Sequence, residues 1–284
     1  MSHLNRDKIA DLIFLKLKDN EEVLKNHFHQ TSEGIGYFYL DDLLPDDLAR
    51  DIFDKFPRTK DVKVKKSIRE YKYVAAQMNK YHPLLEEIIY AFQDDRIVNL
   101  IAVICNYNNV VPDKNLYAGG ISMMGKGNYL NPHLDNSHDK DIKLWRVLNL
   151  LYYVTPNWES SNGGSLELWP NGLKSDPVSI NSKFNRLVVM ATHKNSWHSV
   201  GKVKEDQVRC CVSNYYFSTE PVDAKTSFHV TTFRGRPGQF FKDKILKLDS
   251  SLRMGVRKIF KKGIRENPHV YKKEDSSEKP QNKS

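Results

Sequence analysis

Hydrophobic residues follow two different periods along this chain, and the change falls near residue 110. Over residues 4–30 they recur every three or four positions, which predicts an amphipathic helix that ends before the glycines at 34 and 36. Residues 37–40 form a short aromatic and apolar run typical of a strand. Further helices are predicted over residues 46–56, 84–92 and 97–103. The first 110 residues are therefore expected to be mainly helical, with an exposed lysine-rich stretch at residues 60–66.

Beyond residue 110 the apolar residues alternate with polar ones or come in short runs, which is the pattern of β-strands. Six strands are predicted, over residues 118–124, 147–154, 165–169, 186–190, 197–200 and 208–217. The polar residues 202–207 between the last two predict that these strands pair as a hairpin. Short strands separated by polar turns predict an all-β sandwich or barrel, and the jelly roll, a double-stranded β-helix, is one such architecture.

The chain becomes helical and basic after residue 231. Residues 232–273 hold thirteen Lys or Arg and three Asp or Glu, so this stretch supplies about the whole net charge of +9. A basic extension on a near-neutral body fits either an anionic partner or a solvated helical face. We expect a domain over residues 1–231 (helical to about 110, β-rich over about 115–220), a basic helical extension over 232–273, and a disordered tail over 274–284.

Composition narrows the class of protein. The 284 residues are 39% hydrophobic, which is enough for a sizeable core, and no apolar run reaches the length of a membrane span. The first residues lack the apolar stretch of a secretory signal. The three cysteines, Cys105, Cys210 and Cys211, do not suggest a disulfide framework, and the adjacent pair should point to opposite faces of a strand. We therefore expect a reduced, cytoplasmic protein whose oligomeric state the sequence leaves open.

Candidate metal ligands stand at His133 and Asp135, because residues i and i+2 of a strand project to the same face. Of the ten histidines, His198 is the preferred third ligand, since it lies in an apolar-flanked strand. His193 competes from a predicted turn, and His138 is interpreted as loop surface. Two imidazoles and one carboxylate form the facial triad of non-haem Fe(II) oxygenases, which leaves three positions for a chelating co-substrate and O2.

A candidate anion clamp lies at Arg209. Along its strand, Arg209, Ser213 and Tyr215 should share one face, while Val208 and Val212 face the other way. A guanidinium among apolar neighbours is costly to bury unless an anion meets it, and it grips a carboxylate with two parallel hydrogen bonds. Either a bound carboxylate or an internal acidic residue would satisfy Arg209, and its position after His198 favours the bound carboxylate.

These residues fall within a longer pattern that covers about residues 37–217. Besides Asn131-Pro132-His133-Leu134-Asp135, it contains four further segments, at residues 146–153, 163–169, 186–190 and 198–200. In these motifs the chain resembles the Fe(II)/2-oxoglutarate-dependent oxygenase superfamily, and within it the branch of the prolyl 4-hydroxylase catalytic domain. The resemblance implies a jelly-roll core with flanking helices, an α+β fold that is mainly β. It also implies that His133, Asp135 and His198 bind Fe(II), and that Arg209 binds the distal carboxylate of 2-oxoglutarate.

The chain departs from the family pattern in the secondary contacts to 2-oxoglutarate. The family often has a tyrosine on the strand before the metal motif, where this chain has Met124. The candidates for such contacts are polar residues near the motif or near Arg209: Tyr117, Ser122, Tyr129, Asn149 and Ser213.

The implied function is that of a dioxygenase using Fe(II), 2-oxoglutarate and O2, with ascorbate as a further candidate cofactor. It would hydroxylate an unactivated C–H bond of a peptidyl proline, an amino acid or a sugar-linked metabolite, and release succinate and CO2. Because Asp135 occupies a coordination position, hydroxylation is favoured over halogenation. Two alternatives stay open at this point: a cupin-like metal enzyme without 2-oxoglutarate, and a nucleic-acid-binding protein acting through residues 232–273.

Overall fold

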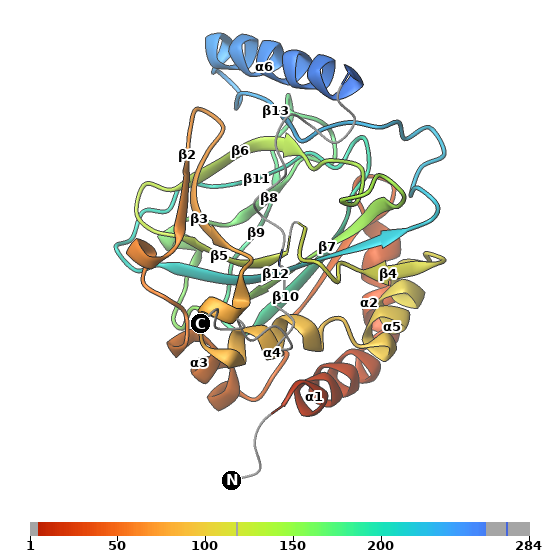
Figure 1. Cartoon of the computed structure of the whole chain (residues 1–284), viewed down its shortest axis with the longest axis vertical. Coiled ribbons are helices and arrows are strands. Elements are labelled where there is room, and N and C mark those ends of the chain that lie inside the picture. The colour runs from red at the N-terminus through yellow and green to blue at the C-terminus, as the bar shows by residue number, and fades with distance from the viewer. Residues whose placement is uncertain (1–4, 118, 260–270, 272–284) are drawn as a thin grey trace, which may run out of the picture.

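The chain folds around one curled antiparallel β-sheet, seen in a computed structural model that describes residues 5–117, 119–259 and 271 (Figure 1). All thirteen strands of these residues are hydrogen-bonded into it. The strands are β1 (Tyr37–Leu40), β2 (Lys63–Lys66), β3 (Glu70–Ala75), β4 (Val110–Pro112), β5 (Gly120–Met124), β6 (Tyr129–Leu134), β7 (Trp145–Tyr153), β8 (Leu166–Leu168), β9 (Val178–Ile180), β10 (Arg186–Ala191), β11 (His198–Val200), β12 (Arg209–Ser218) and β13 (Thr232–Phe233).

Six α-helices of the described residues flank this sheet. They are α1 (Arg6–Asp19), α2 (Glu21–Thr31), α3 (Asp46–Asp54), α4 (Pro83–Ala91), α5 (Asp95–Cys105) and α6 (Phe240–Ile259). The expected fold class, a jelly-roll core with N-terminal and C-terminal helical segments, is confirmed.

The sheet has two halves that face each other. The strand order is β1-β10-β7-β12-β5-β3-β6-β11-β8-β9, so β3 joins a major half, which ends at β5, to a minor half, which begins at β6. Within β12, Cys210 and Val212 pack into the large core beneath the N-terminal helices, whereas Cys211 belongs to a separate cluster inside the barrel. The expectation that the adjacent cysteines face opposite ways is confirmed, because side chains of a strand alternate.

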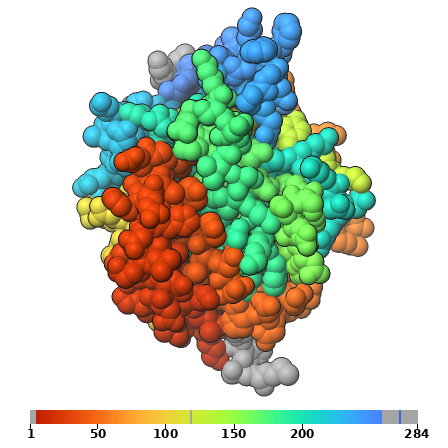
Figure 2. Space-filling view, turned by 180° about the vertical axis from the view of Figure 1, so that it is seen from behind, coloured from red at the N-terminus to blue at the C-terminus, as the bar shows by residue number. Residues whose placement is uncertain are grey.

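The N-terminal helices cover the outer face of the major half. Leu85, Ile88 and Ile89 of α4 are fully buried there, and the Tyr216 hydroxyl of β12 donates to the Phe92 carbonyl at the end of α4. In the space-filling view the N-terminal residues, red to orange, wrap the lower part of one face, while α6, in blue, projects at the top (Figure 2). The helical layer thus leaves the opposite end of the barrel to α6.

The helix predicted over residues 4–30 is two helices. α1 ends at Asp19 and is capped by Asn20, whose side-chain amide donates to the Lys16 carbonyl, and α2 begins at Glu21. Strand β1 has the bounds that the sequence predicted.

The first 110 residues contain five α-helices, as a mainly helical region should, but they also hold the β2–β3 hairpin, which the sequence pattern did not predict. β3 pairs with both β5 and β6, and it therefore closes the barrel beside the candidate metal motif. Its polar composition explains the omission, because β2 is a largely exposed edge strand and shows no apolar alternation.

The predicted hairpin of residues 197–200 with residues 208–217 is also wrong. β11 pairs with β6 and β8 of the minor half, whereas β12 pairs with β4, β5 and β7 of the major half. The connecting loop does not reverse on itself: the Val203 amide donates to Asn128, and the Gly127 amide donates to Val203, so the loop is attached to the β5–β6 turn. His198 and Arg209 consequently lie on opposite halves of the barrel.

Residues 232–259 pack on the body of the molecule, and residues 260–270 and 272–273 of the expected extension lie outside the described residues. β13 pairs with β6, which sets Phe233 opposite His133, and α6 buries Leu246 completely. The boundary at residue 231 stays a prediction, and the tail at residues 274–284 lies outside the described residues. In the part of the chain that the structure describes, no helix has the length and hydrophobicity to cross a membrane.

Candidate functional site

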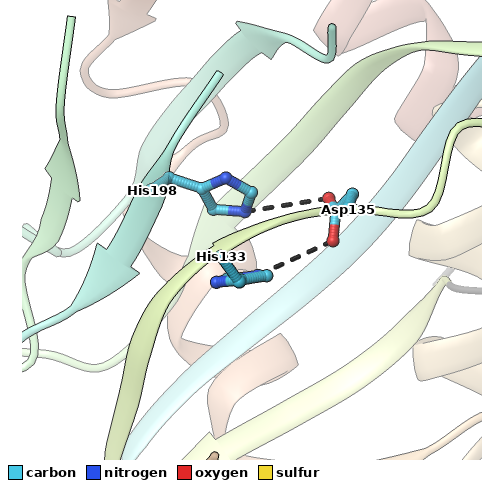
Figure 3. Close-up of side chains that lie close together, drawn as sticks. All are labelled: His133, Asp135 and His198. Atoms are coloured by element: carbon cyan, nitrogen blue, oxygen red, sulfur yellow. Dashed lines mark ion pairs between the residues drawn. The ribbon is translucent and has the colours of Figure 1, made fainter. Parts of the chain in front are cut away.

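Three candidate ligands meet where β6 and β11 run side by side. His133 and His198 are directly opposite each other in the register of the two strands, and Asp135 follows the last residue of β6. The His133 Nε2 atom lies 3.6 Å from Asp135 Oδ1, and the His198 Nε2 atom lies 3.7 Å from Asp135 Oδ2. Both imidazoles are turned toward the carboxylate (Figure 3).

Backbone carbonyls orient both imidazoles. The Nδ1 atom of His133 lies 3.0 Å from the Asn131 carbonyl oxygen, and that of His198 lies 2.9 Å from the Ser196 carbonyl oxygen. A carbonyl can only accept, so in each ring Nδ1 carries the proton and Nε2 presents a lone pair. This is the tautomer that a metal ligand needs.

The protonation states suit metal binding. Burial, followed by the nearby His198, lowers the pKa of His133 to about 3, so that this imidazole is neutral at pH 7. Burial alone would raise the pKa of Asp135, but His198, Arg146 and His133 together lower it to about 2. At pH 7 the cluster therefore contains the neutral imidazole of His133 and the ionised carboxylate of Asp135.

Arg146 of β7 reaches the same carboxylate from the major half. Its Nη1 atom lies 3.8 Å from Asp135 Oδ2, and its guanidinium carbon lies 4.2 Å from the centroid of the Tyr215 ring. Arg146 is buried, and it can steady the orientation of Asp135 as an outer partner does for a metal ligand.

The donor set fits a metal ion. One ligand atom from each of His133, Asp135 and His198 lies within 4.8 Å of the others, and no other such group occurs among the described residues. Asp135 Oδ2 is buried without a hydrogen-bond partner, which is costly unless a cation meets it. Two imidazoles and a carboxylate with open positions are the donors of non-haem Fe(II) sites.

A cavity of about 100 Å³, here called the inner cavity, runs from this cluster to Arg209. Arg209 is 4% exposed, and its Nη1 atom donates to the Gly164 carbonyl at 2.7 Å and to Ser182 Oγ at 3.2 Å. Its Nε atom is buried without a partner. Of the two alternatives for Arg209, the internal salt bridge is not found, because no acidic residue of the described chain pairs with this guanidinium.

The other candidates for co-substrate contacts divide into three groups. Ser122, Asn149 and Ser213 line the inner cavity with Arg209. Tyr117 lines the neighbouring cavity described below. Tyr129 lines neither, because its hydroxyl donates to the Ser67 carbonyl at the exposed side of the β2–β3 hairpin.

Sequence reasoning missed Tyr153 of β7. It is buried beside Arg209, whose guanidinium carbon lies 5.1 Å from the centroid of its ring, and it lines the inner cavity. Burial raises its pKa to about 12, so the hydroxyl keeps its proton.

Met124 lies opposite Arg209 in the strand register, and its sulfur lies 3.3 Å from Arg209 Nη2. Tyr153 thus puts a phenol near Arg209 from the strand on the other side of β12. In the sequence, Tyr153 lies within a continuous apolar run, so nothing in the local pattern marks it as a neighbour of Arg209.

A second cavity of about 330 Å³, here called the outer cavity, opens on the other side of the ligand cluster. Six residues line both cavities, so the cluster lies where they meet: Lys72, Val74, Leu130, His133, Asp135 and Tyr215. The other walls come from the β2–β3 hairpin, the segment before β13, and α6. Phe233 of β13 stacks on the His133 ring with centroids 5.1 Å apart.

Two other histidines were weighed as ligands or surface residues. His193 lies outside the cluster, and its Nε2 atom contacts the Ile35 carbonyl. The interpretation of His138 as loop surface is wrong: it is 3% exposed, stacks on Phe228 and lines the outer cavity. The charged residues next to His138 in the sequence suggested an exposed loop. In the structure the loop folds inward against the segment before β13, which buries His138.

Comparisons with known proteins agree with this geometry. Residues 119–217 match the family described as the 2OG-Fe(II) oxygenase superfamily. No curated protein sequence matches the chain. Among solved structures, the fold is similar to a Trichoplax adhaerens prolyl hydroxylase in complex with a hypoxia inducible factor peptide (20% identity, 72% of this chain and 93% of that chain, TM-score 0.50). It is also similar to a Pseudomonas putida prolyl-4-hydroxylase (14%, 69% and 98%, 0.50) and to prolyl 4-hydroxylases from Phytophthora capsici (16%, 91% and 79%, 0.53).

Neither alternative function is favoured by these matches, which are all to oxygenases. The description of the matched family names 2-oxoglutarate and Fe(II). The match over residues 119–217 contains His133, Asp135, His198 and Arg209, so the family resemblance and the ligand cluster concern the same part of the chain, and the chain is similar there to the 2OG-Fe(II) oxygenase superfamily.

Proposed function

We propose that this chain is a hydroxylase in which His133, Asp135 and His198 hold Fe(II) and Arg209 holds the distal carboxylate of 2-oxoglutarate. The observation that carries the proposal is the inner cavity, because one enclosed space joins the three ligand atoms to a buried guanidinium with no acidic partner in the described chain. A carboxylate there would satisfy Arg209, for which the protein itself provides only neutral acceptors.

The residues of the chain bind and orient, and the cofactors supply the oxidation. Bound together, Fe(II) and 2-oxoglutarate activate O2 for insertion into a C–H bond, with release of succinate and CO2. His133 and His198 would hold the metal through Nε2, because their Nδ1 atoms face backbone carbonyls. Asp135 stays ionised and oriented beside Arg146. Since Asp135 fills one coordination position, hydroxylation is favoured over halogenation.

The inner cavity provides a small dry pocket for the co-substrate. Leu151 and Leu166 are apolar parts of its wall, and Ser122 and Ser213 add hydroxyl groups. Apolar walls exclude bulk water and strengthen the pairing of a carboxylate with a guanidinium. The Tyr153 hydroxyl is a further donor near Arg209.

The substrate would enter through the outer cavity, which shares His133 and Asp135 with the inner one. The substrates open to the proposal are a peptidyl proline, an amino acid and a sugar-linked metabolite. Structures of similar fold include an enzyme in complex with a peptide fragment.

Anaerobic titration with Fe(II) and 2-oxoglutarate tests cofactor use before any substrate is known. We expect the visible charge-transfer band of the metal chelate to appear in the wild-type protein. With Arg209→Ala, the concentration of 2-oxoglutarate needed for half of the band should rise by at least about tenfold, because a charge-assisted bidentate contact is lost.

The control is Arg58→Ala, which removes an exposed arginine paired only with Asp61. It should leave the titration unchanged. A wild-type protein that gives no band, or an Arg209→Ala protein that titrates like the control, would contradict the proposed function.

A further inference from the structure

The outer cavity carries more positive charge than iron and 2-oxoglutarate require, and we infer that the substrate is a phosphorylated small molecule whose phosphate binds there. This inference rests on the proposed function, since it names the substrate class of the same site. It is argued from the residues that line the cavity and from the charges among them.

Six basic side chains line the outer cavity, and they come from three separate parts of the chain: the β2–β3 hairpin, β7 and α6. They are Lys65 (β2), Arg69 (β2–β3 turn), Lys72 (β3), Arg146 (β7), Arg253 and Arg257 (α6). Against them stand two lining acids, Glu70 and Asp135, together with Asp249 of α6, which pairs with Arg69 and Arg253. Six positive and three negative charges leave an excess of three.

Two of these cations lack an acidic partner. Lys72 pairs with Glu70 at 3.1 Å, but Lys65 and Arg257 have no acid within ion-pair distance in the part of the chain that the structure describes. The Arg257 guanidinium instead donates to His138 Nε2 at 3.2 Å. Burial, and then the charge of Arg257, lower the pKa of His138 to about 4, so this ring is a neutral acceptor and leaves the charge of Arg257 uncompensated.

Loading the site does not remove the excess. The two positive charges of Fe(II) and the two negative charges of 2-oxoglutarate cancel, and the distal carboxylate faces Arg209 in the inner cavity rather than the cations of the outer one. A neutral substrate such as a peptidyl proline would leave these cations unpaired while covering them, which carries a desolvation cost. An anionic substrate would pair with these cations as it covers them, so their charge would favour binding.

The arrangement favours a phosphate over a single carboxylate. A phosphate monoester carries close to two negative charges and three acceptor oxygens, so it can meet cations from several directions at once. Lys65 and Arg257 approach the cavity from β2 and from α6. A volume of about 330 Å³ is at the lower end of pockets for small molecules. The phosphate would be bound at the hairpin and α6, with the carbon to be oxidised next to His133 and Asp135.

Calorimetric binding to the holoenzyme formed with redox-inert Ni(II) and saturating 2-oxoglutarate tests the inference. The probes are ribose 5-phosphate, neutral ribose, and glutarate as a dicarboxylate of equal charge. We expect ribose 5-phosphate to bind, ribose not to bind, and glutarate to bind at least about tenfold more weakly than the phosphate. Binding should weaken as salt is raised.

Variants connect the binding to the cavity. Lys65→Met and Arg257→Gln should each weaken ribose 5-phosphate binding by about tenfold. Lys66→Met is the matched control, because Lys66 is exposed, does not line the cavity and points to the other face of β2. Equal binding of ribose, equal binding of glutarate, or phosphate binding that survives both variants would each overturn the inference.

The two proposals fail in different ways. The anaerobic chelate band reports on Fe(II) and 2-oxoglutarate alone, and Lys65→Met and Arg257→Gln should leave it intact. Loss of the band in these variants would point to a damaged fold. An absent band in wild-type protein that still binds ribose 5-phosphate would remove the oxygenase assignment and keep the phosphate pocket.

The opposite face of α6 supports a second, independent proposal. Six large apolar side chains on this helix are exposed, among them Phe241 (85%) and Leu252 (64%): Phe240, Phe241, Ile245, Leu248, Leu252 and Val256. All but Phe240 fall on one stripe along the helix, turned away from Leu246 and Ser250, which are buried. An exposed apolar stripe of this size marks a binding surface.

We propose that this stripe lies on an anionic lipid surface. Residues 240–259 hold six Lys or Arg and two Asp, so two copies of α6 placed face to face would bring like charges together. Phe241, Ile245 and Leu248 alternate with the exposed Lys244 and Lys247, which is the composition of helices that lie in the membrane interface.

Co-sedimentation with vesicles tests this. We expect the full chain to bind vesicles containing phosphatidylglycerol and not vesicles of phosphatidylcholine alone. Phe241→Ser with Leu252→Ser should reduce binding at least about tenfold, while Leu15→Ser, which changes an exposed leucine of α1, should not. Failure to bind the anionic vesicles would overturn the proposal. So would a stable dimer in light scattering that the double variant dissociates, because the stripe would then join two copies.

Discussion

Arg146 is a buried cation that is costly to remove from water and that acts on Asp135. Its Nε and Nη2 atoms have no hydrogen-bond partner in the described chain, and its nearest acid is Asp135 at 3.8 Å. A buried pair of this kind contributes little net stability, because desolvation offsets the attraction. Stacking on Tyr215 holds the guanidinium in place, so its main effect is on the orientation and charge of Asp135.

Lys65 makes the stability of the protein depend on pH. Burial, and then the charge of Lys72, lower its pKa from 10.5 to about 8; Lys63 acts in the same direction and Glu70 opposes it. Between about pH 8 and 10.5 the unfolded chain binds the proton that the folded chain has lost, so this group makes the folded state more stable as pH rises through that window.

Lys65→Met should therefore stabilise the ligand-free protein at pH 7 and flatten the pH dependence between 8 and 10. Urea unfolding at pH 7, 8, 9 and 10 measures both effects, with Lys66→Met as the control that should follow the wild type. A Lys65→Met protein less stable than the wild type at pH 7 would show that the charge of Lys65 is compensated in the folded state.

At the scale of elements, the turn before β8 sets the position of the Arg209 side chain. Gly163 and Gly164 both have positive φ, and the Gly164 carbonyl accepts from Arg209. A Cβ at Gly164 would meet Arg209 Cδ at 3.2 Å and Val203 at 3.1 Å, whereas a Cβ at Gly172, which also has positive φ, meets nothing within 4 Å.

Gly164→Ala and Gly172→Ala are thus a matched pair. Each should lose about 1–2 kcal/mol of stability to backbone strain. Only Gly164→Ala should also weaken 2-oxoglutarate binding, by about tenfold in the anaerobic titration, because the new methyl group displaces Arg209. Equal 2-oxoglutarate affinity in the two variants would show that the turn does not position the guanidinium.

The inner face of α6 is attached to the barrel at a few points. Leu246 is fully buried in a cluster with Met124 and Phe233, and Asp249 pairs with Arg69 of the β2–β3 turn. The helix that provides Arg253 and Arg257 to the outer cavity therefore depends on these contacts.

Leu246→Ala should weaken the packing of α6 on the barrel by about 2–4 kcal/mol of free energy, the usual cost of removing a buried leucine side chain. Limited proteolysis should then cut within α6, and ribose 5-phosphate binding should fall. Leu248→Ala, on the exposed face of the same helix, should be resistant to the protease. If both variants resist equally, the attachment lies elsewhere on the helix.

At the scale of the whole molecule, the two halves of the barrel meet across the inner cavity. The minor half provides His133 and His198, and the major half provides Arg209 and Asn149. A co-substrate that contacts metal and arginine together would connect the two halves, and such a ligand stabilises the fold that binds it.

The expected result is a thermal shift that needs both ligands. At 100 times its dissociation constant, 2-oxoglutarate should add about 2.7 kcal/mol of stability in the presence of Ni(II), and almost none without the metal. Arg209→Ala should keep the shift from Ni(II) and lose the part from 2-oxoglutarate. An equal 2-oxoglutarate shift with and without metal would mean that the acid binds away from the cluster.

The β-rich middle and its approximate strands could be predicted from the sequence, because apolar alternation is a local property. The closeness of His133 and Asp135 follows from a spacing of two in one strand. The same alternation put Arg209, Ser213 and Tyr215 on one face of β12. The motif pattern carried the family resemblance and singled out His198, which the register then set opposite His133.

Only the tertiary structure decided how the strands pair. The predicted hairpin of β11 with β12 failed, and β3 was not predicted. Both concern hydrogen bonds between segments whose pairing leaves no periodic trace in either one. The position of Tyr153 beside Arg209 and of Phe233 on His133 depends on that pairing. The basic excess after residue 231 was visible as composition, but which faces of α6 bear its cations and its apolar stripe depends on packing. Local sequence determines the period and the face of an element, whereas contacts between distant segments determine which faces meet.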